Sequence, residues 1–540
     1  MNRFLRRALT EDHGFTMVAV TLSMMVLGLF AVGAWAAANG DQRPAGTDVD
    51  RKRAYEAAEA GLQWYAYQLS VDTNYWNKCG HDQDPTDIPD FVQNAGKRTA
   101  WRLVGGSDSD ISQTTSTAQE QFAIELVPVN ASKPCTASGQ GGSTLLSDGV
   151  LTVRSTGSYR GKLRQVVGKF RRAGFLDYIW YTGLETAPPA SYTASQTLTS
   201  DWAKSYCNKV RHLRDKNCTE IQFIAGDKIN GPLHTEDDSL LVCGSPTFGR
   251  NNGDKLEVLG STSASNAYKQ NGTGCSGTPN WLGTLQYPPK QVDLPDTNST
   301  IATVANQKYT GETCLQFNSN DTVNVYPNLL CTGTTSQSVS LTGDTTIWVG
   351  TKTGGTCTDY AYYQKYAANS DCGNVGVKGT YSKSITVAAA NDIVVVGNLQ
   401  HTGDGIMGLV ANQFVRVYHP QTWTNNTNDC TGNTLTTAVT KIDAAILATT
   451  GSFMADNYYC GNDLGKLSVL GAIAQKWRGA VGQAYSQCDS KGRNCVASNH
   501  GYTKDYNYDD RLRYREPPNF LDPVTVNWNL LRSSEQSPVK

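Results

Sequence analysis

The sequence predicts a mainly β protein that carries one long apolar helix at its N-terminus. An uncharged run covers residues 15–38, and short apolar segments return at roughly twenty-residue steps from about residue 219, with Gly or Asn at the bends. Charged residues make up only 18% of the 540 residues, which is typical of an extracellular β-rich surface. The net charge of −1 provides no bulk attraction for nucleic acid.

The N-terminal residues have the pattern of a membrane segment. A leader, residues 1–14, contains three arginines, and the bias of positive charge toward the cytoplasm places it inside. As a helix, residues 15–38 would be about 36 Å long, enough to cross a hydrocarbon core of about 30 Å. A secretory signal has a shorter apolar core of about 7–15 residues. We therefore expect one membrane span, with the bulk of the chain outside the cytoplasm.

The leader junction, His13-Gly14-Phe15-Thr16 before the apolar run, resembles the class III leader of type IV prepilins. The resemblance implies cleavage between Gly14 and Phe15 by a prepilin peptidase, methylation of Phe15, and association with other pilins through the N-terminal helix. Major prepilins carry Glu at the fifth mature position, and Ala19 stands there in this chain. Because a carboxylate in hydrocarbon is costly and usually functional, its absence indicates a minor pilin or pseudopilin rather than the bulk filament subunit.

A second helix, amphipathic, is expected over residues 51–78. Small and apolar residues recur at intervals of three and four and form one stripe, in which the candidate helix-packing residues are Ala54, Ala57, Ala58 and Gly61. Small residues let helices approach closely, so the stripe is expected to contact another helix. The alternative is that this helix packs on its own domain. The glycines and proline of residues 39–50 predict a hinge between the two helices.

The stretch AYEAAEAGLQWYAYQL resembles the PilX-like group of large minor pilins. Similar phrases, FLDYIWYTGLET and GKLSVLGAIAQKWRGAVG, occur further along the chain. The resemblance therefore extends over most of the sequence, more loosely after the N-terminal part.

A small β or α+β domain is expected over residues 79–190. Alternating apolar residues predict strands at 121–129, 150–155 and 163–171. The last two flank Ser158-Tyr159-Arg160-Gly161, a turn that fits a β-hairpin.

Residues 191–500 predict a parallel β-solenoid with disulfide-stapled loops. The run Ile393-Val394-Val395-Val396 is typical of a strand buried on both faces, whereas the competing architecture, a β-sandwich, favours alternation. A C-terminal strap is expected over residues 501–540. Its tyrosines would pin it to the solenoid by their rings, or alternatively grip a ligand: Tyr502, Tyr506, Tyr508 and Tyr514.

All fourteen cysteines follow the apolar run. An even number in an exported chain indicates disulfides, and the absence of any C-x-x-C spacing argues against zinc and thioredoxin-like sites. Sequential pairing is preferred because several pairs bracket short loops, although the sequence leaves the connectivity open. The disulfide candidates are Cys79, Cys135, Cys207, Cys218, Cys243, Cys275, Cys314, Cys331, Cys357, Cys372, Cys430, Cys460, Cys488 and Cys495.

Catalytic candidates are few. His234 precedes three acids, Glu236, Asp237 and Asp238, but glycoside hydrolysis needs two carboxylates held about 5–10 Å apart, and a solvated turn is the expectation for adjacent acids. His401 and His419 have no evident Ser or Cys partner and are expected to be structural or surface residues. We expect no enzyme activity and no cofactor.

Two loops offer hard oxygen ligands for calcium, yet neither follows the spacing of an EF-hand. We therefore expect solvated acidic loops and no metal site. Calcium binding at these loops is the alternative. The residues are Asp82, Asp84, Asp87 and Asp90 in the first loop, and Asn425, Asn426, Asn428 and Asp429 in the second.

The sequence thus predicts a large minor pilin or pseudopilin of the cytoplasmic membrane that is incorporated into a filament at the cell surface. Its partners would be other pilins, the prepilin peptidase and the membrane, with a surface ligand in an adhesion role. The alternative is a stationary membrane-anchored surface protein or carbohydrate-active enzyme.

Overall fold

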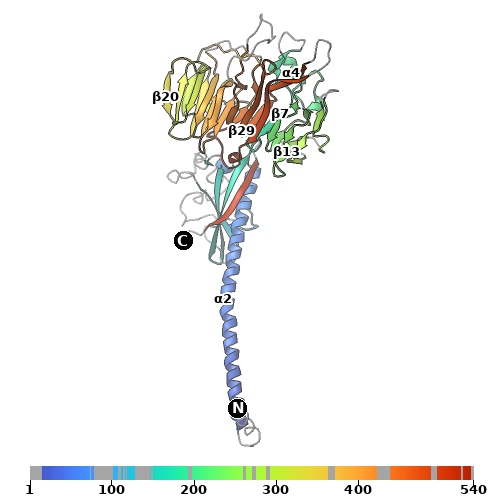
Figure 1. Ribbon diagram of the computed structural model, residues 1–540. Coiled ribbons are helices and arrows are strands. Elements are labelled where there is room, and N and C mark those ends of the chain that lie inside the picture. Colours follow the sequence, from blue (N-terminus) through green and yellow to red (C-terminus); the bar gives the residue numbers. More distant parts are fainter. Residues whose placement is uncertain are drawn as a thin grey trace, which may run out of the picture. The chain divides into compact units, whose positions relative to one another are not determined.

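The structure is a computed structural model of the chain (Figure 1). It describes residues 15–72, 75–77, 101–107, 111–112, 116, 118–127, 146–147, 150–192, 198–259, 263–270, 275–287, 292–362, 371–421, 438–487, 496–523 and 527–536. The chain divides into two compact units. Unit 1 comprises residues 1–146, 151–170 and 530–540, and unit 2 comprises 147–150 and 171–529. The chain is mainly β with one long N-terminal helix, as the sequence predicts.

The N-terminal helix is continuous. Helix α2 runs over Phe15–Val71, 57 residues, and appears as the long blue helix of Figure 1. The expected hinge over residues 39–50 is therefore wrong, because the helix passes through Pro44 without interruption. Proline removes one helical hydrogen bond, but propagation is cooperative once long helical stretches exist on both sides. The helix ends before residue 78, and the short 3-10 helix η1, Tyr75–Asn77, follows it.

Unit 1 is built on an antiparallel sheet beside α2. The strand order is β2-β1-β3-β5-β6-β32, with β4 also paired to β5. The strands are β1 Trp101–Leu103, β2 Ile111–Ser112, β3 Gln121–Leu126, β4 Leu146–Ser147, β5 Val150–Tyr159, β6 Lys162–Ala173 and β32 Asn527–Gln536. The hairpin between β5 and β6 turns at Arg160 and Gly161, both with positive φ, of 45° and 71°, as a tight two-residue turn requires.

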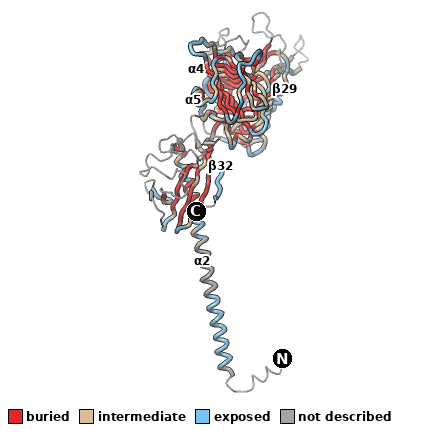
Figure 2. Tube along the Cα trace, turned by 90° about the vertical axis from the view of Figure 1, so that its left-hand side faces the viewer, coloured by how far each residue is buried: buried red, intermediate tan, exposed pale blue. Residues whose placement is uncertain are grey.

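Unit 2 consists of short parallel strands stacked coil upon coil, the arrangement of a parallel β-solenoid. Ile385 pairs with Met407 and Val415 pairs with Phe453, each in parallel register with the next coil. Such strands bury both faces, and the interior is buried throughout (Figure 2). At one end, β18, β19 and β20 pair antiparallel.

The chain builds this solenoid in two arms. The first arm contains β7 Trp180–Leu184, β8 Phe223–Ile224, β9 Lys228–Asn230, β10 Leu233–Thr235, β11 Leu240–Cys243, β12 Thr247–Phe248, β13 Lys255–Val258, β14 Tyr268–Gln270, β15 Asn280–Trp281 and β16 Thr284–Gln286. The second arm contains β17 Gln307–Thr310, β18 Thr313–Asn318, β19 Thr322–Tyr326, β20 Gln337–Ser340, β21 Thr345–Gly350, β22 Val375–Tyr381, β23 Ile385–Ala389, β24 Ile393–His401, β25 Met407–Ala411, β26 Val415–Val417, β27 Lys441–Ala448, β28 Phe453–Ala455, β29 Asp463–Trp477, β30 Gly482–Gln487 and β31 Val496–Tyr508.

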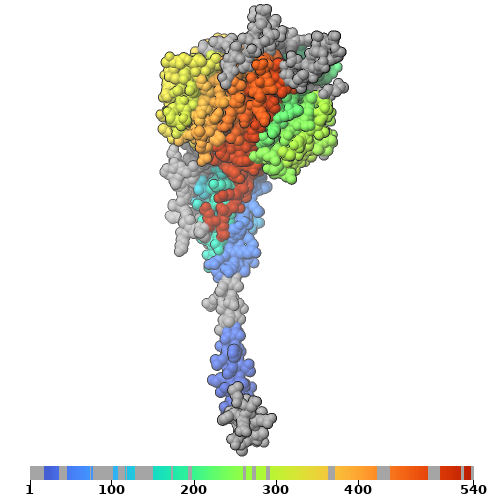
Figure 3. All heavy atoms as spheres, in the orientation of Figure 1, coloured from blue at the N-terminus to red at the C-terminus, as the bar shows by residue number. Residues whose placement is uncertain are grey.

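The second arm ends by pairing with the beginning of the first. Strand β29 pairs in parallel with β7, and β31 pairs in parallel with β9, and we call these two pairings the seam. Strand β7 also pairs with β10 on its other edge, so the first coil lies between the two arms. In Figure 3 the red C-terminal strands accordingly lie between the green first arm and the orange part of the second.

Helices occupy the connections between these strands. They are η3 Phe175–Asp177, η4 Pro189–Ser191, α4 Ser200–Tyr206, η5 Arg211–Leu213, α5 Ile301–Val304 and η6 Asp510–Arg513. Between β16 and β17, Asn298 donates hydrogen bonds to the backbone carbonyls of Ala389 and Val410. The crossing segment therefore contacts the second arm at β23 and β25.

The solenoid and the C-terminal region have different limits in the structure from those that the sequence predicts. The solenoid begins at β7, ahead of the expected limit near residue 190. The expected strap over 501–540 is replaced by three elements, the end of β31, helix η6 and strand β32, which joins the sheet of unit 1. Tyr502, Tyr506 and Tyr508 are buried in the solenoid core, whereas Tyr514 is exposed.

Candidate functional site

The predicted cleavage junction, Gly14–Phe15, lies at the boundary where the described residues begin. Gly14 lies outside the described residues, and Phe15 is the first residue of α2. Ala19 is exposed on the helix. Cleavage and methylation at this junction remain predictions.

The first half of α2 is an exposed apolar surface. The segment Met17–Trp35 has a mean hydropathy of 2.2, is long and apolar enough to cross a membrane, and has none of its residues buried. Phe30 and Trp35 are each more than 70% exposed. Burying a large apolar side chain contributes about 1.5–3 kcal/mol, so a surface of this kind is stable only in hydrocarbon or against partner helices.

The polar side chains of this segment are compatible with hydrocarbon. The Thr21 hydroxyl donates to the carbonyl of Met17 at 2.9 Å, and the Ser23 hydroxyl donates to the carbonyl of Val20 at 2.9 Å. Both hydroxyls are thus satisfied within the helix, as a lipid environment requires.

The small-residue stripe packs on the chain's own sheet. Ala54, Ala57, Ala58 and Gly61 are buried. A Cβ on Gly61 would lie 2.2 Å from Oγ of Ser155, and a Cβ on Gly157 would lie 1.9 Å from the carbonyl oxygen of Ala54. The close approach that small residues allow is therefore made to strand β5 and not to another helix, which is the alternative that the sequence left open.

The opposite face of this half of α2 is free within unit 1. Its exposed side chains are mostly polar: Arg51, Lys52, Glu56, Gln63, Tyr67 and Ser70. Lys52 and Glu56 form an i,i+4 ion pair at 3.8 Å, which contributes little to stability.

Four disulfides join pairs of cysteines that both lie in the described part of unit 2, and each joins cysteines that are consecutive in the sequence. They are Cys207–Cys218, Cys243–Cys275, Cys314–Cys331 and Cys357–Cys372. Cys460 is also disulfide-bonded, and no described cysteine is free. Cys79, Cys135, Cys430, Cys488 and Cys495 lie outside the described residues. Disulfides persist in oxidising compartments, and these bonds therefore fit an extracytoplasmic solenoid.

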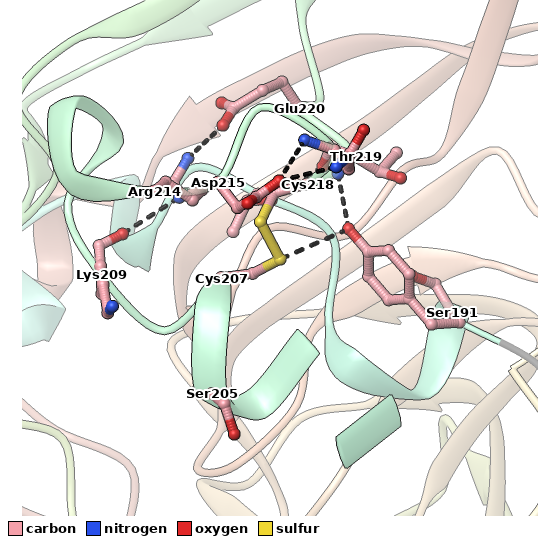
Figure 4. Close-up of a disulfide and its surroundings, with 12 residues drawn as sticks. Ser191, Ser205, Cys207, Lys209, Arg214, Asp215, Cys218, Thr219 and Glu220 are labelled. Atoms are coloured by element: carbon pink, nitrogen blue, oxygen red, sulfur yellow. Dashed lines mark hydrogen bonds and ion pairs between the residues drawn. A yellow bond between two sulfur atoms is a disulfide. The ribbon is translucent and has the colours of Figure 1, made fainter. Parts of the chain in front are cut away.

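The first of these bonds fixes α4 to the solenoid (Figure 4). Cys207 is the C-cap of α4, and its bond to Cys218 closes a short loop. The Tyr192 hydroxyl accepts from the backbone N–H of Thr219 at 2.5 Å and lies 3.8 Å from Sγ of Cys207. Closing a loop of this size stabilises a fold by about 2–4 kcal/mol.

Thiol labelling tests the disulfide framework. Denatured, non-reduced protein from the native host should give a near-zero count of reactive thiols, because the described cysteines are paired, and reduction should release all fourteen. Maleimide labelling followed by intact-mass measurement provides the count. Most cysteines reacting without reduction would remove the argument for an extracytoplasmic solenoid.

The His234 cluster is buried, so the expected solvated turn is wrong. Nδ1 of His234 lies 2.8 Å from Glu257 and Nε2 lies 2.9 Å from Glu236, while the ring stacks on Tyr181 at 5.2 Å. Burial alone would lower the pKa of His234, but the hydrogen bonds to Glu236 and Glu257 outweigh it and raise the pKa. Because His234 is closed to solvent and both nitrogens are engaged, the cluster ties β10 to β13.

The neighbouring acids are also paired. Asp237 is fully buried and forms an ion pair with Arg214, and it accepts backbone N–H groups of Glu185 and Arg211 at 2.9 and 2.7 Å. Burial raises the pKa of Asp237, and the Arg214 charge opposes this. Asp238 lies 2.5 Å from Nδ1 of His212. No local pattern identified Arg214 as the partner of Asp237, because Arg214 follows η5 and is more than twenty residues away from the acids in the sequence.

The two isolated histidines also have partners. Nδ1 of His401 lies 2.9 Å from Asp443, and His419 lies beside the carbonyl of Asp456 and the side chain of Gln421. Burial lowers the pKa of His419. Both therefore hold strands and loops of the second arm together.

Buried charges also line the seam, where sequence reasoning did not place them. Arg478 donates to Glu185 at 2.8 Å, and Lys504 donates to Asp227 at 2.7 Å. All four side chains are at most 5% exposed. In each pair the cation comes from the second arm and the carboxylate from the first, so we call these residues the seam ion pairs.

Metal sites are not evident among the described residues, where no group of three or more His, Cys, Asp or Glu side chains is arranged to hold an ion. The two acidic loops proposed as calcium alternatives, Asp82–Asp90 and Asn425–Asp429, lie outside the described residues. Calcium at either loop stays a prediction.

Comparisons with known proteins give little. No protein-family model and no curated protein matches the chain. Among solved structures, the crystal structure of the competence-associated pilin ComZ from Thermus thermophilus matches with a TM-score of 0.30 and 13% identity, covering 90% of this chain and 97% of that chain. At this level of similarity we draw no conclusion from it.

Proposed function

We propose that the chain is a large minor pilin or pseudopilin, inserted in the cytoplasmic membrane and then incorporated into a filament. The observation that carries this proposal is the division of α2. Its first half exposes every described side chain of an apolar span, while its second half is buried against its own antiparallel sheet. Such a helix can leave the bilayer only by exchanging lipid for similar helices of neighbouring subunits.

A role at the tip, in assembly or in adhesion follows from two features. Ala19 offers no carboxylate to a neighbour's N-terminal amine, a contact that the resemblance to prepilins implies for major subunits. The solenoid of unit 2 is also large compared with the helix and sheet of unit 1. A subunit of this kind starts or decorates a filament rather than extending it, and its solenoid is available to a surface ligand.

The second candidate is a stationary membrane-anchored surface protein or carbohydrate-active enzyme. The solenoid architecture favours it, because such folds present long ligand-binding surfaces. It differs from the first candidate at the leader, which a stationary anchor would keep.

N-terminal mass spectrometry decides between them. Protein from the native host is expected to begin at Phe15, and the Gly14→Leu variant should keep the leader, because the implied cleavage site requires a small residue before Phe15. Asp12→Asn, also in the leader, serves as the matched control and should be processed. A uniformly intact leader in the unmodified protein would contradict the prepilin assignment.

A further inference from the structure

A polar groove of about 570 Å³ runs over one corner of the solenoid, between the stacked turns and α4. Its floor is formed by residues of three coils: Asn412 and Gln413 after β25, Thr450 and Gly451 after β27, and Lys476 near the end of β29. Its wall is formed by Pro188, Pro189, Ser200, Lys204 and Asn208. All of these residues belong to unit 2.

The floor is a regular ladder. The backbone N–H and the hydroxyl of Thr450 donate to the carbonyl of Asn412 at 3.0 and 2.6 Å, and the N–H of Trp477 donates to the carbonyl of Gly451 at 3.1 Å. Gly451 is required here, since a Cβ would lie 2.1 Å from the carbonyl oxygen of Gln413. Successive turns therefore stack at the strand spacing of about 4.8 Å, which is comparable to one sugar unit of an extended glycan.

The wall is held in place before any ligand arrives. The disulfide Cys207–Cys218 ties the end of α4 to the next loop, and the Thr199 side chain caps its start by accepting from Trp202 at 3.2 Å. Ala203, buried on the inner face of α4, belongs to the same apolar cluster as Trp477. A preformed groove avoids the entropic cost of ordering a site on binding.

The polar part of the lining combines amides, hydroxyls and two lysines with a single carboxylate, and the rest is apolar. Asp359, the only acid among the lining residues, accepts from the Asn391 amide at 2.9 Å. Among the described residues, Lys204 pairs with the highly exposed Asp201 alone, and no acid pairs with Lys476. The groove thus offers donors for sugar hydroxyls and an unneutralised cation for an anionic substituent.

We propose that this groove binds an extended acidic oligosaccharide, with its sugar hydroxyls on the Asn412 to Lys476 ladder and a carboxylate at Lys476. Binding rather than cleavage is expected, because glycoside hydrolysis uses two carboxylates flanking the bond and the lining has one. The proposal rests on the extracytoplasmic placement in the proposed function. Its test measures glycan binding and not leader processing, so the two can fail separately.

The test is calorimetric titration of the full chain in detergent with short oligogalacturonates, and with cello-oligosaccharides of equal length as the neutral comparison. Oligogalacturonate should bind more tightly, and Lys476→Gln should weaken its binding about tenfold, as expected for loss of a charge-assisted hydrogen bond. Lys466→Gln, an exposed position on the same strand outside the groove, is the matched control and should bind as the unmodified protein does.

Three outcomes would overturn the proposal: no binding of the acidic glycan at millimolar concentration, equal binding of the neutral glycan, or equal affinity for Lys476→Gln and Lys466→Gln. A second variant, Gln413→Ala, should weaken both glycans, because its amide reaches the shared hydroxyls. Circular dichroism of each variant checks that the solenoid is folded.

Discussion

Replacing Arg478 with methionine is expected to lower the free energy of unfolding of the solenoid by about 3–5 kcal/mol, the cost of leaving one partner of a buried ion pair unpaired. Glu185 would keep hydrogen bonds from Trp180 and Thr182 but lose its ion-pair partner at 2.8 Å. The guanidinium also lies 3.6 Å from the ring centroid of Phe223, a cation–π contact that methionine cannot make. Arg478 is fully buried, and this burial lowers its pKa.

Urea unfolding of the full chain measures this loss, and hydrogen exchange at β7 and β29 locates it at the seam. The control is Lys352→Met, which removes an exposed ion pair with Asp371 and should cost less than about 1 kcal/mol. The double variant Arg478→Met with Glu185→Gln removes both charges and should recover part of the loss. Equal stability of Arg478→Met and Lys352→Met would show that the seam ion pairs do not join the two arms.

Gly157→Val is expected to destabilise unit 1 by about 3 kcal/mol or more, at or beyond the upper end of overpacking effects. The Cβ would overlap backbone atoms of Ala54 and Ala58, at 1.9 and 2.5 Å, and a helix backbone cannot yield as the end of a flexible side chain can. Helix α2 would have to separate from β5.

The control is Gly46→Ala in helix α2. A Cβ at this position meets nothing within 4 Å, and helix propensity favours alanine over glycine by about 1 kcal/mol. Hydrogen exchange of α2 beyond residue 50 and limited proteolysis report the separation. Unchanged protection in Gly157→Val would mean that the stripe of small residues does not hold the helix to its sheet.

Features encoded in local sequence could be predicted. The apolar helix, the hairpin turn at Arg160 and Gly161, and the parallel strands around residues 385–417 follow from hydrophobic periodicity and turn chemistry, which depend on neighbouring residues. Consecutive pairing of the cysteines was the preferred prediction because several pairs bracket short loops, but the sequence left the connectivity open.

Features that depend on distant residues could not be predicted. Strand β29 meets β7 across almost three hundred residues, and the pair Arg478 and Glu185 spans 293 positions, for which no local pattern exists. Asp237 looked solvated because its partner Arg214 lies in another loop. Strand β32 joins the sheet of unit 1 after the whole solenoid, whereas its sequence suggested only a strap.

The most direct test of the account is quantitative mass spectrometry of filaments sheared from the native host. If the chain is a minor pilin, it should occur in the filament fraction, begin at Phe15 and be present in far fewer copies than a small pilin that carries Glu at the fifth mature position. Deletion should then change filament number or adhesion more than filament diameter. Absence of the chain from filaments, with its leader intact in the membrane, would contradict the pilin assignment, and its presence as the dominant subunit would contradict the tip role.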